Sequence, residues 1–598
     1  MRPKFKTLPR NFFPRNKQSH RPLSTTPISD RISVPIISEL IAKQHWSELK
    51  QTHLKDSNPT KLLHQLLESE VDSDLIFRYF NWSQKDLNVS HTLELTFRLL
   101  HSLANAKKYP KIRAFLNGFV KRNVEHSNFT IFHSLSMSSS RFCTNSIIVD
   151  MLVLAYVNNL KTHLAFEAFK RAGDYGFKLS VLSCNPLLSA LVKENRIGQV
   201  EFVYKEMIKR RIKGDLYSFN IVVNGFCKAG KLNKAGDIVQ DMKAFGVSPN
   251  AVTYNTLIDG HCKMGKLGKM YKAEAILKEM DANKIGPNEI TYNILIDGFC
   301  KDENVVAAMK VFGEMRRRGL KPNVVTYNSL INGLCTEGKL EEACDLQDEM
   351  LRFGLKPNVF TFNALVNGFC KKKMIKEARE LFDDIGKQGL VPNVITYNTL
   401  IDAYCKNGMM DGAFCLRSLM LEKRVFPNAS TYNCFIAGFG RRGDMEKARE
   451  VLDEMQDKGL KADLITYNIL IDAYCKKGET RKATRILKDM FSKGMSPSHL
   501  TYNTLMDAYC REGNLKAALN VRAQMEKDGK RANAATYNVL IKGYCEKGKL
   551  EVANGLLNEM LEKGLIPNRT TYEIIREEMM DKGFVPDIEG HLCSVSDR

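Results

Sequence analysis

The sequence predicts an all-α protein, a right-handed superhelical α-solenoid of about twelve 35-residue helix-turn-helix repeats. Three observations lead to this fold class. The tripeptide Thr-Tyr-Asn recurs along the chain, and the series of asparagines anchored on it, from Asn185 to Asn538, has steps of 35 residues except for one step of 38. Each period also holds two stretches with apolar residues at three- and four-residue spacing, which is typical of amphipathic helices. Glycine and proline separate these stretches, so each period is expected to form a helical hairpin.

Residues 1–30 are expected to be a transit peptide rather than part of the fold. They hold seven Lys and Arg, their first acidic residue is Asp30, and hydroxyl residues cluster near their end. They lack the apolar core of a secretory signal, and this composition is typical of organellar targeting segments. The excess of arginine over serine favours the mitochondrion, with the chloroplast as the alternative. A basic arm without a targeting role also fits the composition.

The chain of 598 residues has 89 Lys and Arg, 67 Asp and Glu, and a formal net charge of +22. Seven basic residues against Asp30 give the leader six of these charges, which leaves sixteen on the body. Such a balance favours a polyanionic partner, although solubility or an acidic protein partner would also account for it. An apolar content of 44% excludes wholesale disorder, and the sequence contains no apolar run long enough for a membrane helix.

The predicted organisation has two further segments around the array. Residues 31–145 are expected to form a divergent N-terminal helical region, and the Ser- and Asn-rich stretch Asn123–Ser146 is expected to be a loop. The array fills 146–568 in twelve units, and 569–598 is a truncated last repeat with a tail. One hairpin does not bury its apolar stripe alone, so neighbouring units must stack.

Unit 464–498 shows the expected hairpin. Gly478 follows the first helix as a C-cap that tolerates positive φ, Gly494 ends the second helix, and Pro497 prevents its continuation. The three extra residues of the 38-residue unit fall near Gly268–Tyr271, where they are expected to lengthen the turn between two helices without breaking the stack.

The recurring pattern resembles the pentatricopeptide repeat family. It reads Thr-Tyr-Asn-x-Leu-Ile-x-x-Tyr-Cys-Lys-x-Gly, followed by a second helix with Ala and Met and then Gly-x-x-Pro-Asn, at period 35 over about 70% of the chain. Tetratricopeptide repeats have period 34, and their Trp-x-x-Leu-Gly pattern is absent. Phe77–Trp82 (FRYFNW) is also similar to the region that precedes the repeats in such proteins. The organisation matches the repeat-only subclass of the plant organellar type.

The recurring asparagine can read nucleobases. Asparagine offers both donors and an acceptor, and helical repeats that read single-stranded RNA use two or three side chains for each base. A solvated surface residue or a local cap is the alternative interpretation. We call the following residues the reader asparagines: Asn185, Asn220, Asn255, Asn293, Asn328, Asn363, Asn398, Asn433, Asn468, Asn503 and Asn538.

The resemblance assigns a second base contact to the last residue of each unit, here called the end residue. Pro-Asn and Pro-Asp are also good turn formers, and both roles can hold together. The end residues are Asp215, Asn250, Asn288, Asn323, Asn358, Asn393, Asn428, Asp463, Ser498, Asn533 and Asn568.

The family's code translates these pairs into a target. Asn with Asp implies uracil, Asn with Ser implies cytosine, and Asn with Asn implies either pyrimidine. Units 181–568 then spell U-Y-Y-Y-Y-Y-Y-U-C-Y-Y from 5′ to 3′, a pyrimidine-rich tract of about eleven nucleotides. The first unit, with Asp150 and Ser180, fits no pair of this code.

A basic residue follows the reader asparagine by eight positions in nine units, and the resemblance places this position against the RNA backbone. Nine phosphate contacts would give a slope of log K on log salt of about −6. Complementing the helix dipole is the alternative role. Thr336 and Glu546 depart from this basic ladder, which comprises Lys193, Lys228, Lys263, Lys301, Lys371, Lys406, Arg441, Lys476 and Arg511.

An apolar residue three positions before most reader asparagines is a candidate for sandwiching a base, and the edge of the core between units is the equal alternative. Ser430 and Ala535 are too small for this role, so unit 429–463 is expected to grip its nucleotide weakly. The sandwich residues are Val252, Ile290, Val325, Phe360, Ile395, Ile465 and Leu500.

Nine of the fifteen cysteines share one position of the repeat, and Gly440 replaces a tenth. No Cys-x-x-Cys pair and no His at zinc-finger spacing accompany them, so zinc and disulfides are not expected. These cysteines are predicted to be small apolar residues packed between helices. They are Cys227, Cys262, Cys300, Cys335, Cys370, Cys405, Cys475, Cys510 and Cys545.

The leading functional interpretation is sequence-specific binding of single-stranded organellar RNA, which supports RNA stabilisation, processing, splicing or translation. RNA-processing or translation factors are the other expected partners. We expect a monomer without cofactor or metal, and no enzyme, because no His-x-Glu with Pro-Cys-x-x-Cys, no acidic nuclease cluster and no phosphate-binding loop occurs. A protein-binding helical scaffold is the alternative.

Overall fold

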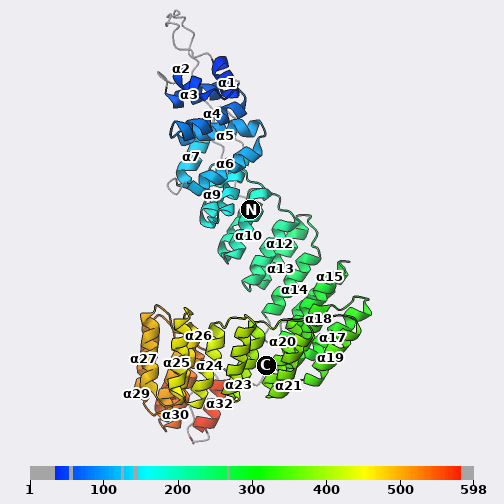
Figure 1. The fold of residues 1–598 in the computed structure, drawn as a ribbon, viewed down its shortest axis with the longest axis vertical. Coiled ribbons are helices and arrows are strands. Elements are labelled where there is room, and N and C mark those ends of the chain that lie inside the picture. The colour runs from blue at the N-terminus through cyan, green and yellow to red at the C-terminus, as the bar shows by residue number, and fades with distance from the viewer. Residues whose placement is uncertain are drawn as a thin grey trace, which may run out of the picture. The chain divides into compact units, whose positions relative to one another are not determined.

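The computed structural model describes residues 34–52, 58–69, 71–122, 127–138, 146–264, 270–580 and 583. All regular structure in this part of the chain is helical, and the chain divides into two compact units, residues 1–249 and 250–598 (Figure 1). None of the helices described is both long and apolar enough to span a bilayer. The predicted transit peptide, residues 1–30, lies outside the described residues.

The N-terminal part of the first unit is built from seven helices without a repeated motif. Its core includes the segment Phe77–Trp82, in which Tyr79, Phe80 and Trp82 are buried. Trp82 stacks on Trp46 with ring centroids 4.8 Å apart. The helices are α1 (Val34–Ala42), α2 (Trp46–Thr52), α3 (Pro59–Glu68), α4 (Ser73–Asp86), α5 (Leu93–Asn105), α6 (Tyr109–Arg122) and α7 (Asn128–Ser138).

The prediction of a loop over Asn123–Ser146 is wrong, because α7 lies within it. Ile131, Phe132 and Leu135 are buried at helical spacing, and α7 packs against α5 and α9 (Thr162–Asp174). The abundance of Ser and Asn hides this short apolar face. Asn128 at the start of the helix is also buried, and its amide donates to the Leu164 carbonyl oxygen at 3.1 Å.

Twelve helical hairpins follow, and they confirm the predicted all-α repeat fold. The first helices of the hairpins are α8 (Ser146–Asn158), α10 (Val181–Lys193), α12 (Leu216–Lys228), α14 (Ala251–Lys263), α16 (Glu289–Lys301), α18 (Val324–Glu337), α20 (Val359–Lys371), α22 (Val394–Lys406), α24 (Ala429–Arg442), α26 (Leu464–Lys476), α28 (His499–Arg511) and α30 (Ala534–Glu546).

The second helix of each hairpin packs on its own first helix, and first helices pack on the first helices of the next hairpin within each compact unit. The second helices are α9, α11 (Ile197–Lys209), α13 (Leu232–Ala244), α15 (Met270–Ala282), α17 (Val305–Arg317), α19 (Leu340–Arg352), α21 (Ile375–Lys387), α23 (Met410–Glu422), α25 (Met445–Asp457), α27 (Thr480–Ser492), α29 (Leu515–Lys527) and α31 (Leu550–Glu562). A half hairpin, α32 (Arg569–Ile574), runs into a π-helical turn over Ile575–Met580.

Glycines end the helices as predicted. Gly478 and Gly494 adopt φ of 77° and 73°, in the left-handed region that glycine enters without steric cost. The 38-residue unit also follows the prediction: six residues separate α14 from α15, whereas three separate α16 from α17. Five of these six residues lie outside the described residues, and α14 still packs on both α15 and α16, so the stack continues past the insertion.

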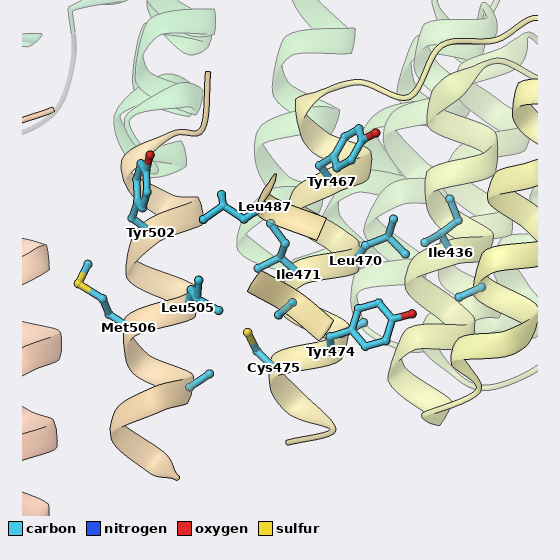
Figure 2. Close-up of a cluster of buried hydrophobic side chains, with 14 of the residues drawn as sticks. Ile436, Tyr467, Leu470, Ile471, Tyr474, Cys475, Leu487, Tyr502, Leu505 and Met506 are labelled. Carbon is cyan, nitrogen blue, oxygen red and sulfur yellow. The ribbon is translucent and has the colours of Figure 1, made fainter. Parts of the chain in front are cut away.

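The stack is held by apolar residues on both sides of each first helix. In Figure 2, Ile471 of α26 lies on the side that faces Leu505 of α28, whereas Leu470 lies on the opposite side, toward Ile436 of α24, and all four side chains are buried. Burial of such side chains contributes about 1.5–3 kcal/mol each, which is the main force that holds neighbouring hairpins together.

The repeated cysteines lie in the same core, as predicted. Cys475 is buried, and burial raises the pKa of its thiol to about 12. A Cβ added at Gly298 would lie 2.6 Å from the Sγ atom of Cys262, so glycine in one helix makes room for cysteine in the preceding one. Gly440, which replaces a cysteine, faces Ala473 instead.

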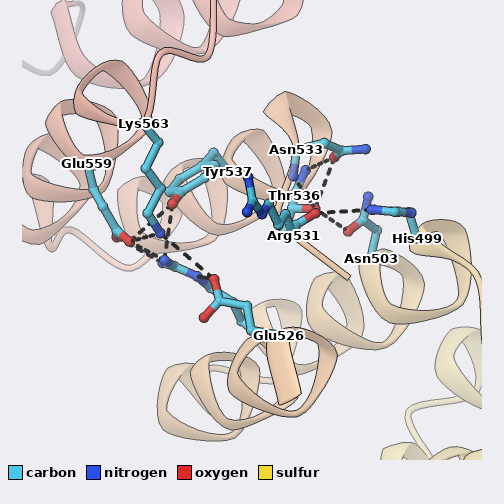
Figure 3. A network of polar contacts seen from close by, with 10 residues as sticks. His499, Asn503, Glu526, Arg531, Asn533, Thr536, Tyr537, Glu559 and Lys563 are labelled. Atoms are coloured by element: carbon cyan, nitrogen blue, oxygen red, sulfur yellow. Dashed lines mark hydrogen bonds and ion pairs between the residues drawn. The ribbon is translucent and has the colours of Figure 1, made fainter. Parts of the chain in front are cut away.

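Ion pairs on the second helices join neighbouring hairpins. Arg417 contacts Glu454 at 2.9 Å, and Arg522 pairs with Glu559 one repeat further on. Figure 3 shows Glu559 also receiving hydrogen bonds from Tyr537 and Lys563. The Arg522 guanidinium is the main cause that lowers the pKa of Glu559 to about 2.

Candidate nucleic-acid interface

Each end residue is the N-cap of the next first helix. The side chain of Asn533, for example, accepts a hydrogen bond from the Thr536 backbone N–H at 3.0 Å, and the Thr536 hydroxyl accepts one from the Asn533 backbone N–H at 3.4 Å. This reciprocal capping box recurs at all eleven end residues. The turn-forming role considered for these residues is therefore real, and it fixes where each of their side chains lies.

The hydroxyl of the same threonine also holds the preceding reader asparagine. Thr536 donates to Asn503 Oδ1 at 3.0 Å, and Figure 3 shows Asn503, Thr536 and Asn533 meeting at one point. The hydroxyl-to-Oδ1 distances are 2.6 to 3.0 Å in nine units, at Asn185, Asn255, Asn293, Asn328, Asn398, Asn433, Asn468, Asn503 and Asn538.

The amide nitrogen of the reader asparagine points at the end residue of its own unit. In seven units Nδ2 donates to the end residue's Oδ1 at 3.1 to 3.5 Å. The sequence-predicted pairs are therefore neighbours in space, as base reading by two side chains requires. The seven pairs start from Asn185, Asn255, Asn293, Asn328, Asn398, Asn433 and Asn538.

These contacts decide which atoms remain for a ligand. The oxygen of the reader asparagine is taken by the threonine, and one amide hydrogen is taken by the end residue, so a single N–H donor is left. An Asn end residue adds its own amide donors, whereas an Asp end residue adds a carboxylate oxygen. The array thus presents donors in most units and a donor with an acceptor in units 181–215 and 429–463.

The two aspartate end residues are held ionised. Partial burial tends to raise the pKa of Asp463, but hydrogen bonds from the Thr466 backbone and hydroxyl and from Asn433 outweigh it and lower that pKa. The pKa of Asp215 is lowered in the same way by Ser218 and Asn185 against the effect of burial. Both carboxylates are therefore pure acceptors at neutral pH.

Two units differ from this pattern. Asn363 Oδ1 is buried and has no hydrogen-bond partner among the described residues, and Thr396 contacts only the end residue Asn393 of the pair, at 3.1 Å. In unit 146–180 the carboxylate of Asp150 takes the asparagine's place and accepts from the Ser183 hydroxyl and, at 2.9 Å, from the Ser180 backbone N–H. Asp150 offers only acceptors where the reader asparagines offer a donor.

The seven sandwich residues are exposed beside the reader asparagines. Their exposed fractions range from 57% at Val252 to 68% at Phe360, so they do not belong to the core between units. Leu182 and Tyr217 occupy the same position and are equally exposed, although the sequence prediction omitted them. Their distance of three residues from Asn185 and Asn220 was the signal that could have found them.

The basic ladder lies in the last turn of each first helix, and all nine side chains are exposed. Five of its members are not free, because an aspartate one helical turn earlier pairs with them. The sequence analysis also missed the threonines that connect reader and end residues. A hydroxyl residue three positions after each end residue is a capping-box signal, so the sequence contains it.

The fold and these ladders define an α-helical repeat protein with a polar contact set that recurs in most of its repeats. The model of the PPR repeat family matches the chain eleven times, and the matches together run from residue 179 to 575. The chain belongs to the pentatricopeptide repeat family.

Relatives in Arabidopsis thaliana carry the same family name. One pentatricopeptide repeat-containing protein is 33% identical over 168 residues, 28% of this chain and 15% of the relative. A second is 33% identical over 187 residues, 31% of this chain and 25% of the relative. A third, described as mitochondrial, is 32% identical over 180 residues, 30% of this chain and 34% of the relative. The matched segments thus span at most about a third of these relatives.

Among solved structures, the chain is similar to the pentatricopeptide repeat protein PPR10 from maize. The identity is 21% and the TM-score 0.41, over 91% of this chain and 95% of the maize protein. Its complex with an 18-nucleotide psaJ RNA element gives 20% identity and a TM-score of 0.32, over 94% of this chain and 98% of that one.

Proposed function

We propose that this protein binds single-stranded RNA sequence-specifically, reading about one nucleotide per repeat. The observation that carries the proposal is the repeated polar lock: a hydroxyl, from threonine in eight units and from Ser218 in one, fixes the reader asparagine, and in seven of these units the asparagine Nδ2 is directed at the end residue. A polar side chain that is already ordered loses little entropy on binding, so each contact retains most of its free energy.

The lock supports a pyrimidine-rich target of about eleven nucleotides. A pyrimidine presents the O2 acceptor to an asparagine N–H, and uracil adds an N3–H donor that the ionised carboxylates of Asp215 and Asp463 suit. Cytosine has an unprotonated N3, which accepts from the hydroxyl of Ser498. The physical chemistry of these side chains therefore agrees with the tract that the family's code implies.

Two further surfaces support RNA over a protein ligand. The exposed apolar sandwich residues flank the reader asparagines, where unstacked bases would lie between neighbouring units. The basic ladder supplies cations for phosphate groups at the other end of the same helices. A protein-binding scaffold would not need polar locks that recur with the period of the array.

We further propose that the protein acts in an organelle by occupying its RNA. Bound RNA is shielded from exonucleases and from base pairing, which suits roles in stabilisation, processing, splicing or translation together with other factors. The acid-free basic leader supports mitochondrial import. Three relatives described as mitochondrial, 27% to 32% identical to this chain, support the same destination over the chloroplast.

A change in base preference tests the proposal. Asn468→Thr combined with Ser498→Asn should shift the preferred ninth base from cytosine to adenine, which the family's code assigns to Thr with Asn. The measurement is the affinity of the full chain for oligonucleotides that differ only at this base. An equal loss for all four bases would contradict the code, and no preference of the unaltered chain for oligo-pyrimidine over oligo-purine RNA would contradict the function itself.

The single change Ser498→Asn is the matched control. Asparagine and serine are comparable N-caps, so the helix start at α28 is preserved. This variant should accept uracil and cytosine equally at the ninth position and should keep its preference everywhere else.

A further inference from the structure

The basic ladder divides into two classes according to the residue one turn earlier. In five first helices an aspartate at that position forms an ion pair with the ladder cation, at 2.6 Å in four of them. The pairs are Asp259 with Lys263, Asp297 with Lys301, Asp402 with Lys406, Asp472 with Lys476, and Asp507 with Arg511.

The other four members of the ladder have no such partner. Ser189, Asn224, Asn367 and Ala437 stand where the aspartates would be. Within the described residues no ion pair is formed by Lys193, Lys228, Lys371 or Arg441. Helices α10, α12, α20 and α24 contain these cations and no carboxylate at all, and α24 has Arg442 in addition.

The two classes present different charges to a phosphate. An aspartate within 2.6 Å cancels the charge of its lysine, and a phosphate that approaches must displace the carboxylate or accept its repulsion. An exposed ion pair contributes less than about 1 kcal/mol to stability, so its main effect is on the local field. The four carboxylate-free helices keep a full positive charge for the ligand.

We propose that the RNA backbone is held at α10, α12, α20 and α24, while the five aspartates restrain phosphate binding in the units between. This inference rests on the proposed function and refines it. The cations of these four helices would then contact the phosphates of the first, second, sixth and eighth nucleotides of the tract. Phosphate contacts carry no sequence information, so the aspartates raise the share of the affinity that depends on base identity.

The salt dependence of binding measures how many cations meet phosphates. Four contacts predict a slope of log K on log salt of about −3, whereas nine contacts predict about −6. The experiment titrates the full-length protein with the predicted pyrimidine oligonucleotide by fluorescence anisotropy, at salt between about 50 and 200 mM. An oligo-purine RNA of equal length is titrated in parallel.

Three variants separate the classes. Replacing Lys193, Lys228, Lys371 and Arg441 by Gln should bring the slope close to zero and weaken binding roughly 100-fold at physiological salt. The matched control neutralises both members of the five ion pairs, with Asp→Asn and Lys or Arg→Gln, and should lose far less slope and affinity than the four-cation variant. The five Asp→Asn changes alone should steepen the slope by about 3.5 and lower the ratio of pyrimidine to purine affinity.

The outcomes are distinguishable. If the control variant loses as much slope as the four-cation variant, or if the Asp→Asn variant binds with an unchanged slope, the inference is wrong although the proposed function stands. If the unaltered protein shows no pyrimidine preference, the proposed function fails first. Circular dichroism on each variant checks that the helical fold is kept, since the cations are exposed and the aspartates are partly exposed and outside the core.

Discussion

The two ends of the first helices behave differently from one repeat to the next. At the N-terminal turn the end residue, the threonine or serine and the reader asparagine make the same contacts in unit after unit. At the C-terminal turn the ladder cation is paired with an aspartate in some units and unpaired in others. Gly440 also replaces the usual cysteine there in one unit. Both turns belong to one helix, but the hydroxyl residues of the first are buried and the cations of the second are exposed.

The difference shows what each end must do. A base contact depends on a few tenths of an ångström, so the N-terminal turn is built from buried, mutually satisfied hydrogen bonds that tolerate little change. A phosphate contact is long-range and adds to its neighbours, so individual cations can be absent or cancelled. The N-terminal turn of each first helix therefore fixes the geometry of base contacts, whereas the C-terminal turn sets the net charge that a phosphate meets.

Removing one threonine hydroxyl should have the largest effect. Thr431→Val loses the capping box of α24 and leaves Asn398 Oδ1 without its donor, at a combined cost of about 3 kcal/mol. Hydrogen exchange of the α24 peptides measures the local loss, and discrimination at the nucleotide read by Asn398 should fall with it.

Thr399→Val is the control for this change. Thr399 is half-buried, and within the described part of the chain its hydroxyl bonds to the Ile395 carbonyl oxygen of its own helix, so its replacement should alter exchange by a few tenths of a kcal/mol. Equal effects of the two variants would show that the N-terminal turn is no more demanding than the surface.

A second test concerns the C-terminal turn. Gly440→Cys restores the usual cysteine, but its Cβ would lie 2.7 Å from the Cβ of Ala473, so we expect a loss of about 2 kcal/mol from overpacking. Ala473→Gly costs about 1 kcal/mol in helix propensity, yet it should relieve that overlap in the double variant. Thermal unfolding of the unaltered protein, the two single variants and the double variant gives the coupling free energy between the two positions. If the two losses of stability simply add, the steric explanation is wrong.

The aspartate caps should make part of the N-terminal turn sensitive to acid. Because the pKa of Asp463 is lower in the folded chain than the unfolded value of about 3.9, its contribution to stability is complete above that pH. It is lost as the pH falls through the lowered pKa. Hydrogen exchange in α26 should therefore accelerate in acid more than in α22, which Asn393 caps, and Asp463→Asn should abolish the difference.

The smallest effect is expected at a sandwich position. Ser430→Val restores an apolar side chain beside Asn433 and should strengthen binding of an RNA with uracil at the eighth position about 3-fold. Val325→Ser is the opposite change in a unit that already has the apolar residue, and it should weaken binding by a similar factor. A gain that does not depend on the eighth base would point to general stabilisation.

The periodic part of the fold was predictable from the sequence because one pattern is repeated many times. A single hairpin such as 464–498 contains its own stops at Gly478 and Gly494, and its apolar spacing identifies both helices. The helix at Asn128 was not predicted, because three apolar residues in a polar stretch occur once and have no copy to compare with.

The site was predictable as a set of positions and not as a set of contacts. Spacing identified the reader asparagines, the end residues and the basic ladder. The hydroxyl of Thr536 on Asn503, a repeat earlier, depends on how closely neighbouring hairpins pack, which no local pattern states. The pairing of Asp402 with Lys406 was predictable from their spacing of four residues on a helix.

The connection between Asn538 and Thr571 has a consequence for the architecture as a whole. The side chains that complete one recognition module come from two successive hairpins, so each module runs across the border between them. The half hairpin α32 is then the piece that finishes the last module. Anyone who recombines such arrays should take the asparagine and the hydroxyl residue of the next first helix from the same parent, because any junction between two successive first helices separates this pair.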